Sequence, residues 1–306
     1  MLDKSTERAF RKAARLETEA RAEKQPELVG FSKAQEKWIG GLLDSFGLPL
    51  GNIERIRKAS VVELKAAGME GAAAATAFWD PILREIVIID PELHSAQELR
   101  RVLYHELSHG VLDPFAYMEI DPKTLRPIIE NGIPKFRPEM LGVFKTEQNV
   151  VQFVNFMQRS VEIALATGVY VNHYQKILGQ KFHALEGDMQ VLIRKASDPT
   201  LTSEKKEEIN KDIRRTGEDL QIVAVALLRE TWAIVMEMAF VNQGGLKQKS
   251  SAQKAAWERE ALVGEPFDVH SEAQYFLRLF YQTDDAGVQE RRDASKQFVE
   301  NNTFPK

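Results

Sequence analysis

The sequence contains no cysteine, and this absence excludes three kinds of chemistry. Disulfide bonds, cysteine-ligated metal sites and thiol nucleophiles all require a thiol, so none of them can operate here. Histidine is also scarce, with 6 residues among 306. Any histidine-based site must therefore be assembled from very few side chains, and the spacing of those side chains becomes informative.

Charge of one sign does not accumulate along the chain. The formal net charge is −4, from 41 basic and 45 acidic side chains, and no sustained basic tract occurs in the segments that we expect to fold. Because binding to a phosphate backbone requires clustered Lys and Arg side chains, we do not expect nucleic acid as a partner.

Long uninterrupted apolar runs are missing as well. Residues 1–8 are polar and lack the apolar core of a Sec signal peptide, so we expect a cytoplasmic protein, or one exported by a route that reads other signals. Residues 220–241 reach membrane-spanning length, but Arg229, Glu230 and Glu237 interrupt them. This pattern predicts a buried helix and no stable membrane insertion.

The most informative pattern that is present is H-E-x-x-H, at residues 105–109. Side chains four positions apart share one face of a helix, so His105 and His109 can bind one zinc ion while Glu106 lies beside the open coordination position. Residues 95–98 match the capping box S-x-x-E and predict a helix that begins at residue 96. Gly110, followed by Asp-Pro, predicts where it ends.

Four further elements are predicted upstream of this helix. The β-branched run 86–89 predicts a strand buried on both faces, and residues 74–79 and 53–57 predict two more strands. Residues 32–35 open an amphipathic helix that continues to Phe46. The resulting order is helix, three strands and motif helix.

That order, with TAFWDPILREIVIID followed by LRRVLYHELSHG, resembles the zincin metallopeptidases and, more specifically, the gluzincins. The similarity covers about residues 31–113. It implies an α+β, mostly helical fold in which a small mixed or antiparallel sheet packs on the H-E-x-x-H helix. In such a fold residues 74–79 are the edge strand that holds the backbone of a peptide substrate. The implied cofactor is Zn²⁺, bound by His105 and His109, with Glu106 as the general base.

A catalytic zinc ion usually has three protein ligands, and the resemblance implies that the third is a glutamate from a later helix, commonly in the pattern E-x-x-A. Glu230 fits, because Ala233 is small enough to let that helix approach the motif helix. Glu162 lies closer to the motif in sequence but is followed by Leu165, and it stays the alternative third ligand. A buried ion pair with Arg229 would explain Glu230 without a metal.

The group that stabilises the transition state is less well defined by the sequence. Aromatic and histidine side chains in the later helices are candidates, although each is more often a packing or surface residue: Tyr170, Tyr174 and His270.

The chain divides into five predicted segments. They are a charged helical or mobile arm (1–29), the sheet and motif helix (30–113), an irregular Pro-rich segment (114–146), a helical subdomain carrying the third ligand (147–243) and C-terminal helices (244–306). The subdomain, a large helical insertion, is predicted to contain a long helix over 150–176, a shorter one over 187–196 and a long one over 203–241.

The main hypothesis is therefore a zinc metalloendopeptidase that hydrolyses peptide bonds with a zinc-activated water, acting on a limited set of protein or peptide substrates. Two alternatives stay open. The protein could be a non-proteolytic zinc-binding regulator on the same fold, or a helical interaction protein with an accidental H-E-x-x-H. A di-iron bundle is disfavoured because E-x-x-H occurs only once. The sequence does not predict cleavage specificity or oligomeric state.

Overall fold

The computed structural model describes residues 25–71, 73, 75–121, 126–130, 133–137, 139–169, 173–259 and 268–306. These residues are mostly helical and include a small mixed four-stranded sheet, as the α+β prediction required. They form two compact units. The first consists of the residues up to 153, together with 236–243 and 271–306, and the second of residues 154–235 and 244–270.

The sheet of the first unit has the strand order β1-β2-β4-β3. Its strands β1 (Glu27–Val29), β2 (Arg55–Ala59) and β4 (Glu85–Ile89) are parallel, and β3 (Ala77–Asp80) pairs antiparallel with β4 at one edge. Every residue of β4 is buried, which explains its run of β-branched residues. The predicted antiparallel edge strand is confirmed, although its first residue is Ala77.

Two elements of this unit were not predicted. Strand β1 falls inside the segment 1–29, for which an arm was predicted, so that prediction is wrong for residues 27–29; residues 1–24 lie outside the described part of the chain. Helix α3 (Val61–Ala66) follows β2 directly and begins with a reciprocal capping box between Ser60 and Glu63. Both elements are too short to show a clear hydrophobic period.

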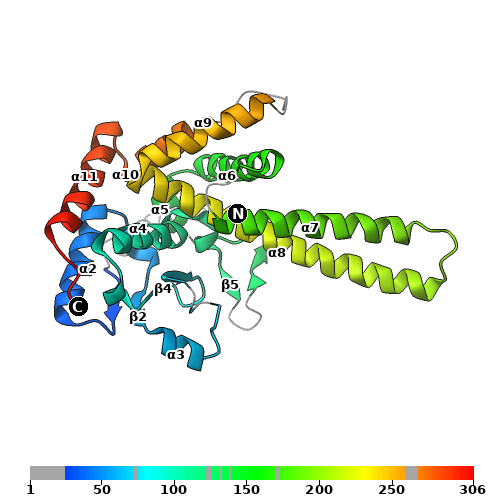
Figure 1. Cartoon of the computed structure of the whole chain (residues 1–306), viewed down its shortest axis with the longest axis horizontal. Coiled ribbons are helices and arrows are strands. Elements are labelled where there is room, and N and C mark those ends of the chain that lie inside the picture. Colours follow the sequence, from blue (N-terminus) through cyan, green and yellow to red (C-terminus); the bar gives the residue numbers. More distant parts are fainter. Residues whose placement is uncertain are drawn as a thin grey trace, which may run out of the picture. The chain divides into compact units, whose positions relative to one another are not determined.

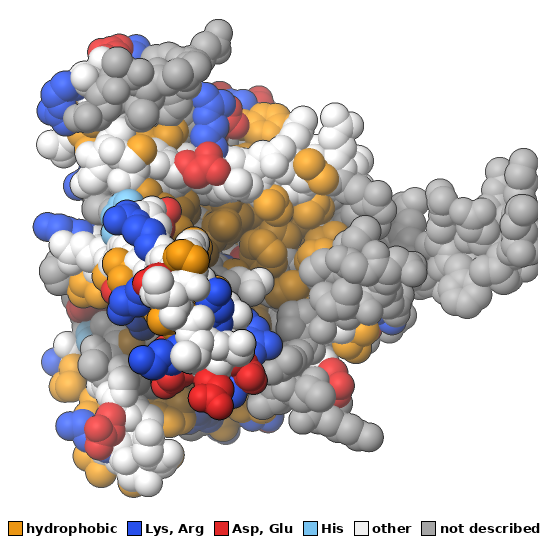
Figure 2. All heavy atoms as spheres, turned by 90° about the vertical axis from the view of Figure 1, so that its right-hand side faces the viewer, with side chains coloured by type: hydrophobic (Ala, Val, Ile, Leu, Met, Phe, Trp, Pro, Cys, Tyr) orange, Lys and Arg blue, Asp and Glu red, His pale blue; other side chains and the backbone are white. Residues whose placement is uncertain are grey.

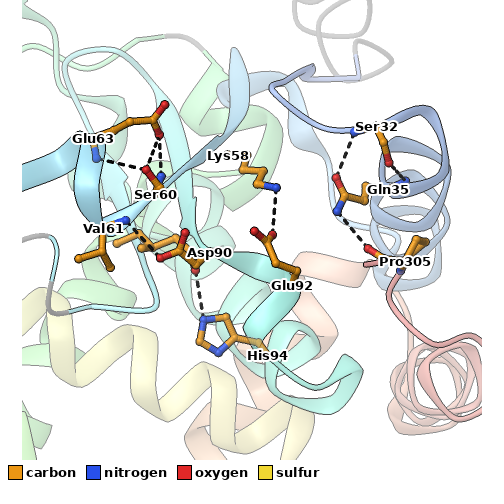
Figure 3. A network of polar contacts seen from close by, with 11 residues as sticks. Ser32, Gln35, Lys58, Ser60, Val61, Glu63, Asp90, Glu92, His94 and Pro305 are labelled. Atoms are coloured by element: carbon orange, nitrogen blue, oxygen red, sulfur yellow. Dashed lines mark hydrogen bonds and ion pairs between the residues drawn. The ribbon is translucent and has the colours of Figure 1, made fainter.

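Polar contacts fix the connection from the sheet into α4 (Ala96–Leu107), the motif helix (Figure 3). Asp90, the residue after β4, accepts a hydrogen bond from the backbone N–H of Val61 at 3.2 Å. Glu92 forms an ion pair with Lys58 of β2 at 2.9 Å. The chain that leaves β4 is therefore tied to the end of the neighbouring strand before α4 begins.

The start of α4 is confirmed at residue 96. The Ser95 hydroxyl accepts a hydrogen bond from the backbone N–H of Glu98 at 3.2 Å. The Glu98 carboxylate does not complete the capping box; it lies 3.3 Å from Nδ1 of His94. The other ring nitrogen of His94 lies 3.1 Å from the carbonyl oxygen of Ile89 (Figure 3). His94 thus links the end of β4 to the first turn of the motif helix.

Helix α2 (Lys33–Phe46) begins with the predicted capping box and packs against α11 (Asp285–Asn301). The indole N–H of Trp38 donates to the carbonyl of Asn302 at 2.9 Å, and its ring meets Phe304 edge to face at 5.0 Å. Gln35 also donates to the carbonyl of Pro305 (Figure 3). The C-terminal residues are therefore held against α2.

The segment 114–146 is less irregular than predicted. Its described residues contain a 3₁₀ turn, two pairs of two-residue strands and a short helix. These are η5 (Pro114–Tyr117), β5 (Ile120–Asp121) with β6 (Arg126–Pro127), β7 (Ile129–Glu130) with β8 (Ile133–Pro134), and α5 (Glu139–Phe144).

The long helices differ from the prediction in one place. The predicted helix over 150–176 is two helices, α6 (Glu147–Thr167) and α7 (His173–Ala196), because Gly168 after α6 adopts a φ of 65°, which a helix does not allow. Helix α7 therefore begins well before residue 187. Helix α8 (Ser203–Val241) has the predicted bounds. The remaining helices are α9 (Gln243–Arg259) and α10 (Val269–Tyr281).

Helices α7 and α8 lie side by side and antiparallel within the second unit (Figure 1). Their contact continues onto α6 through a core of Val161, Leu178 and Leu227, beside which Gln175 donates a hydrogen bond to Thr231 at 2.7 Å. The less exposed positions of α8 recur at spacings of three and four, as in a coiled-coil seam. They include Ile209, Ile213, Leu220, Val223 and Leu227.

The end of the α7–α8 pair is polar. Figure 2 looks onto it and shows Lys and Arg side chains interspersed with Asp and Glu side chains, without separation into patches of one sign. Across the described residues, no helix combines the length and the apolar character that a membrane crossing requires.

Candidate metal centre

The two motif histidines lie on consecutive but different kinds of helical turn. His105 belongs to the last turn of α4, and His109 belongs to η4 (Ser108–Leu112), a π-helical turn that continues from α4 without a break. The predicted stop, Gly110 followed by Asp113 and Pro114, is confirmed at its second part. Gly110 lies inside this turn, and the helical chain ends at Asp113, which has an extended backbone.

His105 and His109 face the same side, as the spacing predicted. Their ring centroids are 5.0 Å apart and the rings are nearly perpendicular. Both side chains are half-buried, whereas Glu106 between them in sequence is buried, with 7% of its surface exposed. The two imidazoles are therefore partly accessible while the glutamate is shielded from solvent, an arrangement that strengthens any electrostatic interaction the carboxylate makes.

A second glutamate contacts His105 directly. The Glu237 carboxylate lies 3.2 Å from Nδ1 of His105, and both of its oxygens accept from one Arg101 nitrogen, at 3.3 and 3.4 Å. A carboxylate can only accept here, so this contact places a proton on Nδ1, and in the neutral imidazole the lone pair is then on Nε2. That is the form in which a histidine binds a metal through Nε2.

Aromatic packing positions the C-terminal end of α8, and with it Glu237, against α4. The Tyr104 ring stacks on Phe240, with centroids 4.1 Å apart and planes 6° from parallel. The Tyr104 hydroxyl lies 3.2 Å from that of Tyr281. Burial is the main cause that raises the pKa of both hydroxyl groups, so the two tyrosines are neutral at ordinary pH.

Two buried arginines connect α11 to α4 and to the C-terminal end of α8 through hydrogen bonds. Arg100 of α4 donates to the Ser295 hydroxyl at 3.0 Å and to the carbonyl of Arg292 at 3.2 Å. Arg292 in turn donates to the carbonyl of Ala239 at 2.9 Å and to Gln274 at 2.7 Å. Burial lowers the pKa of both guanidinium groups, and these hydrogen bonds offset part of the cost of burying them.

Three side chains form a group that could hold a metal ion: His105, His109 and Glu230. One ligand atom from each lies within 4.8 Å of the others, and all three are half-buried. Glu230 precedes Glu237 by seven residues, or about two helical turns, so the two carboxylates share one face of α8. Ala233, on the same helix, is fully buried. Two imidazoles and a carboxylate are a ligand set that suits Zn²⁺ in hydrolytic sites.

The alternative ligand Glu162 has other surroundings. It is exposed on α6, where its carboxylate accepts a hydrogen bond from Gln158, one turn earlier, at 2.8 Å. It does not belong to the group formed with the two histidines. Its contact is the ordinary one between side chains four positions apart on a solvated helix face.

The candidates for stabilising the transition state are not brought together with the histidines by any contact described here. Tyr174 is exposed on α7, with 52% of its surface accessible, and His270 is half-buried on α10, where its backbone N–H donates to Asp268 at 3.0 Å. Tyr170 lies outside the described residues.

Two contributors to the site were not identified from the sequence. One is Arg101, which sits on the motif helix one turn before His105 and pairs with Glu237. The other is the contact of Glu237 with Nδ1 of His105. The available signal was the shared helix face of Glu230 and Glu237, since side chains two turns apart approach the same neighbouring helix.

Comparisons of the chain with known protein families, with curated proteins and with solved structures found no match. Its own residues and their arrangement are therefore the basis for a functional conclusion.

Proposed function

We propose that this protein is a zinc-dependent peptidase in which His105, His109 and Glu230 hold the metal ion. The observation that carries the proposal is the convergence of these three ligand atoms within 4.8 Å, on a chain in which the residue after the first histidine is a buried glutamate. Glu230 lies on α8, far in sequence from the two histidines, so its proximity to them does not follow from the spacing of the motif.

A zinc ion in such a site supplies a Lewis acid for the scissile carbonyl and lowers the pKa of a bound water. The chain's own residues do the rest. Glu106 takes a proton from the attacking water on its carboxylate and passes it to the leaving amine, so it acts first as a general base and then as a general acid. Glu237 holds the Nδ1 proton of His105 and so keeps that ring in one orientation.

The proposed substrate is a peptide in an extended conformation. Strand β3 is at the edge of the four-stranded sheet, and within the described residues its only partner in that sheet is β4. An edge strand with one unpaired side can add a further strand through main-chain hydrogen bonds. Helix α4 packs against β3, so a peptide added there would lie beside the helix that carries His105 and Glu106.

The test compares the purified wild-type protein with Glu106→Gln. We expect about one zinc ion per chain in both proteins, measured by elemental analysis, and cleavage of a peptide library only by the wild type. The amide keeps the size of the side chain but cannot take a proton from water, so the rate should fall by at least about 100-fold. Full activity of the variant would end the peptidase proposal.

The same measurements separate the alternatives. Stoichiometric zinc without cleavage of any library peptide would favour the non-proteolytic regulator. Absence of zinc from the wild-type protein, even after incubation with the metal, would leave the helical interaction protein.

A further inference from the structure

The turn that carries His109 is unusual for a helical segment. Helix η4 is a π-helical turn, which is wider than an α-helical turn and is rare except at functional sites. Four of its five residues are buried: Ser108, Gly110, Val111 and Leu112. His109 is the remaining one and is half-buried. The turn therefore presents a single side chain from an otherwise enclosed backbone.

The carbonyl groups at this end of the helical chain receive hydrogen bonds from side chains. The last carbonyls of a helix have no partner within it, and buried ones need another donor. The Asn52 amide donates to the carbonyl of Gly110, and the Tyr117 hydroxyl donates to that of Val111 at 2.7 Å. These are the two carbonyls that follow His109 in the chain.

The two donors approach the turn from separate elements. Asn52 is the last residue of η1 (Leu50–Asn52). The Arg84 guanidinium fixes η1 by donating to the carbonyls of Asn52 and Gly51, at 3.0 and 3.1 Å. Tyr117 ends η5, on the other flank of the turn. The backbone after His109 is therefore fixed by anchors that do not depend on the hydrogen bonds of the helix.

Close packing fixes the same backbone on a third side. A Cβ added to Gly110 would come within 3.1 Å of the Trp79 ring and would also collide with Ile53. A side chain there would require Ile53 and the Trp79 ring to move, so the turn packs closely on strand β3 and on the residue after η1.

We infer that Asn52 and Tyr117 are positioning residues for His109: they hold the backbone that follows His109 and so keep this imidazole in its place beside His105. The inference rests on the proposed metal function and concerns how the site is kept ready for the ion. Loss of either donor would leave a buried carbonyl without its partner at the end of the helical chain, so the backbone there would shift and the His109 ring would shift with it.

The burial and the hydrogen bonding of Asn52 support this role. Its side chain is 3% exposed, and its Oδ1 has no hydrogen-bond partner among the described residues. Burying an amide with one atom unsatisfied destabilises the folded protein. An apolar residue would avoid that cost, so the asparagine is explained by the one bond that it makes to Gly110.

The experiment measures metal binding in the full chain with Asn52→Leu and Tyr117→Phe. Zinc affinity is measured by competition with a chromophoric chelator, and Co²⁺ replaces zinc to report coordination geometry through its visible spectrum. We expect Asn52→Leu to weaken zinc binding about 10-fold, and Tyr117→Phe to weaken it less. Both should shift the Co²⁺ bands, because the position of one ligand changes.

A matched control is Ser160→Ala, which also removes one buried hydroxyl group, that of an α6 residue that donates to the carbonyl of Phe156 at 2.9 Å. It should lower thermal stability without changing zinc affinity or the Co²⁺ spectrum. If Asn52→Leu does not fold, as judged by circular dichroism, the zinc affinity and the Co²⁺ spectrum of Tyr117→Phe test the inference alone. Tyr117→Phe removes a single oxygen atom and is therefore expected to fold.

The outcomes distinguish this inference from the proposed function. Wild-type protein that binds Co²⁺, with both variants matching its affinity and spectrum, overturns the positioning role and leaves the metal site standing. Wild-type protein that binds neither Zn²⁺ nor Co²⁺ overturns the proposed function and this inference with it.

Discussion

The two halves of α8 differ in charge and in burial. From Ser203 to about Ile222 the helix is charged and largely exposed, apart from the seam that faces α7. From Thr231 to Phe240 nearly every residue is buried. A carboxylate costs little in the first half, because water solvates it. In the second half the same group costs several kcal/mol unless a cation or a hydrogen-bond donor compensates it.

This difference makes the two carboxylates at the apolar end informative. Glu237 is compensated by Arg101 and by the Nδ1–H of His105. Glu230 lies two turns earlier and belongs to the group with His105 and His109. We propose that a metal ion compensates Glu230, whereas Glu162, on an exposed face, needs no such partner.

The largest expected effect is the loss of metal on replacing Glu230. Glu230→Gln removes a charged ligand, so we expect zinc affinity to fall by more than about 100-fold, beyond the usual effect of losing a residue that only orients a ligand. Glu237→Gln should weaken binding about 10- to 100-fold. Titration with a competing chelator measures both.

Glu162→Gln is the matched control for this pair. It makes the same chemical change on the exposed face of α6, so zinc affinity should not change. A loss of affinity in Glu162→Gln that equals the loss in Glu230→Gln would reverse the assignment of the third ligand.

The second prediction tests the contrast in burial along α8. Leu227 is fully buried against Val161 and Leu178, so Leu227→Ala should lower the free energy of unfolding by about 2–5 kcal/mol. Ile222 is 67% exposed, and Ile222→Ala should change it by no more than about 0.5 kcal/mol. Urea unfolding followed by circular dichroism gives both values, and similar losses would show that the two positions do not differ in packing.

The third prediction compares two helical glycines of the first unit. Gly110→Ala introduces a Cβ that collides with Ile53 and Trp79, and should cost about 1–3 kcal/mol of stability. Gly40 lies within α2 with no atom within 4 Å of an added Cβ, so Gly40→Ala should stabilise the protein by about 0.5–1 kcal/mol. Thermal denaturation measures the two shifts, and shifts of the same sign would contradict the packing of Gly110.

The smallest expected effect is on the pH dependence of stability. Because burial raises the pKa of Tyr104 and Tyr281 above that of an unfolded tyrosine, about 10, the folded state keeps these protons after the unfolded state has lost them. The contribution of these two hydroxyl groups to the free energy of unfolding is fully present below about pH 10. It is lost as the pH rises toward their pKa values in the folded state. Stability measured by urea unfolding should therefore decline in alkaline solution, and less steeply in Tyr281→Phe. An equal slope in the variant would contradict this.

Local signals in the sequence were sufficient for several elements. The serine caps placed the starts of α2 and α4, the β-branched run placed β4, and the apolar period placed both ends of α8. Each of these depends on neighbours within about one or two turns. The break between α6 and α7 was missed, because a single glycine is tolerated in many helices and only its backbone conformation shows that it ends this one.

The sequence by itself determined that two imidazoles and a glutamate share a short stretch of helix, since that follows from spacing alone. It did not determine the π-helical turn under His109 or the donors from η1 and η5 that bind the carbonyls of this turn. It favoured Glu230 through the pattern E-x-x-A but left Glu162 open, because both lie in apolar helical sequence. Burial and distance between helices come from long-range packing, so it was the folded chain that left Glu162 exposed, set Glu237 against His105 and grouped Glu230 with the histidines.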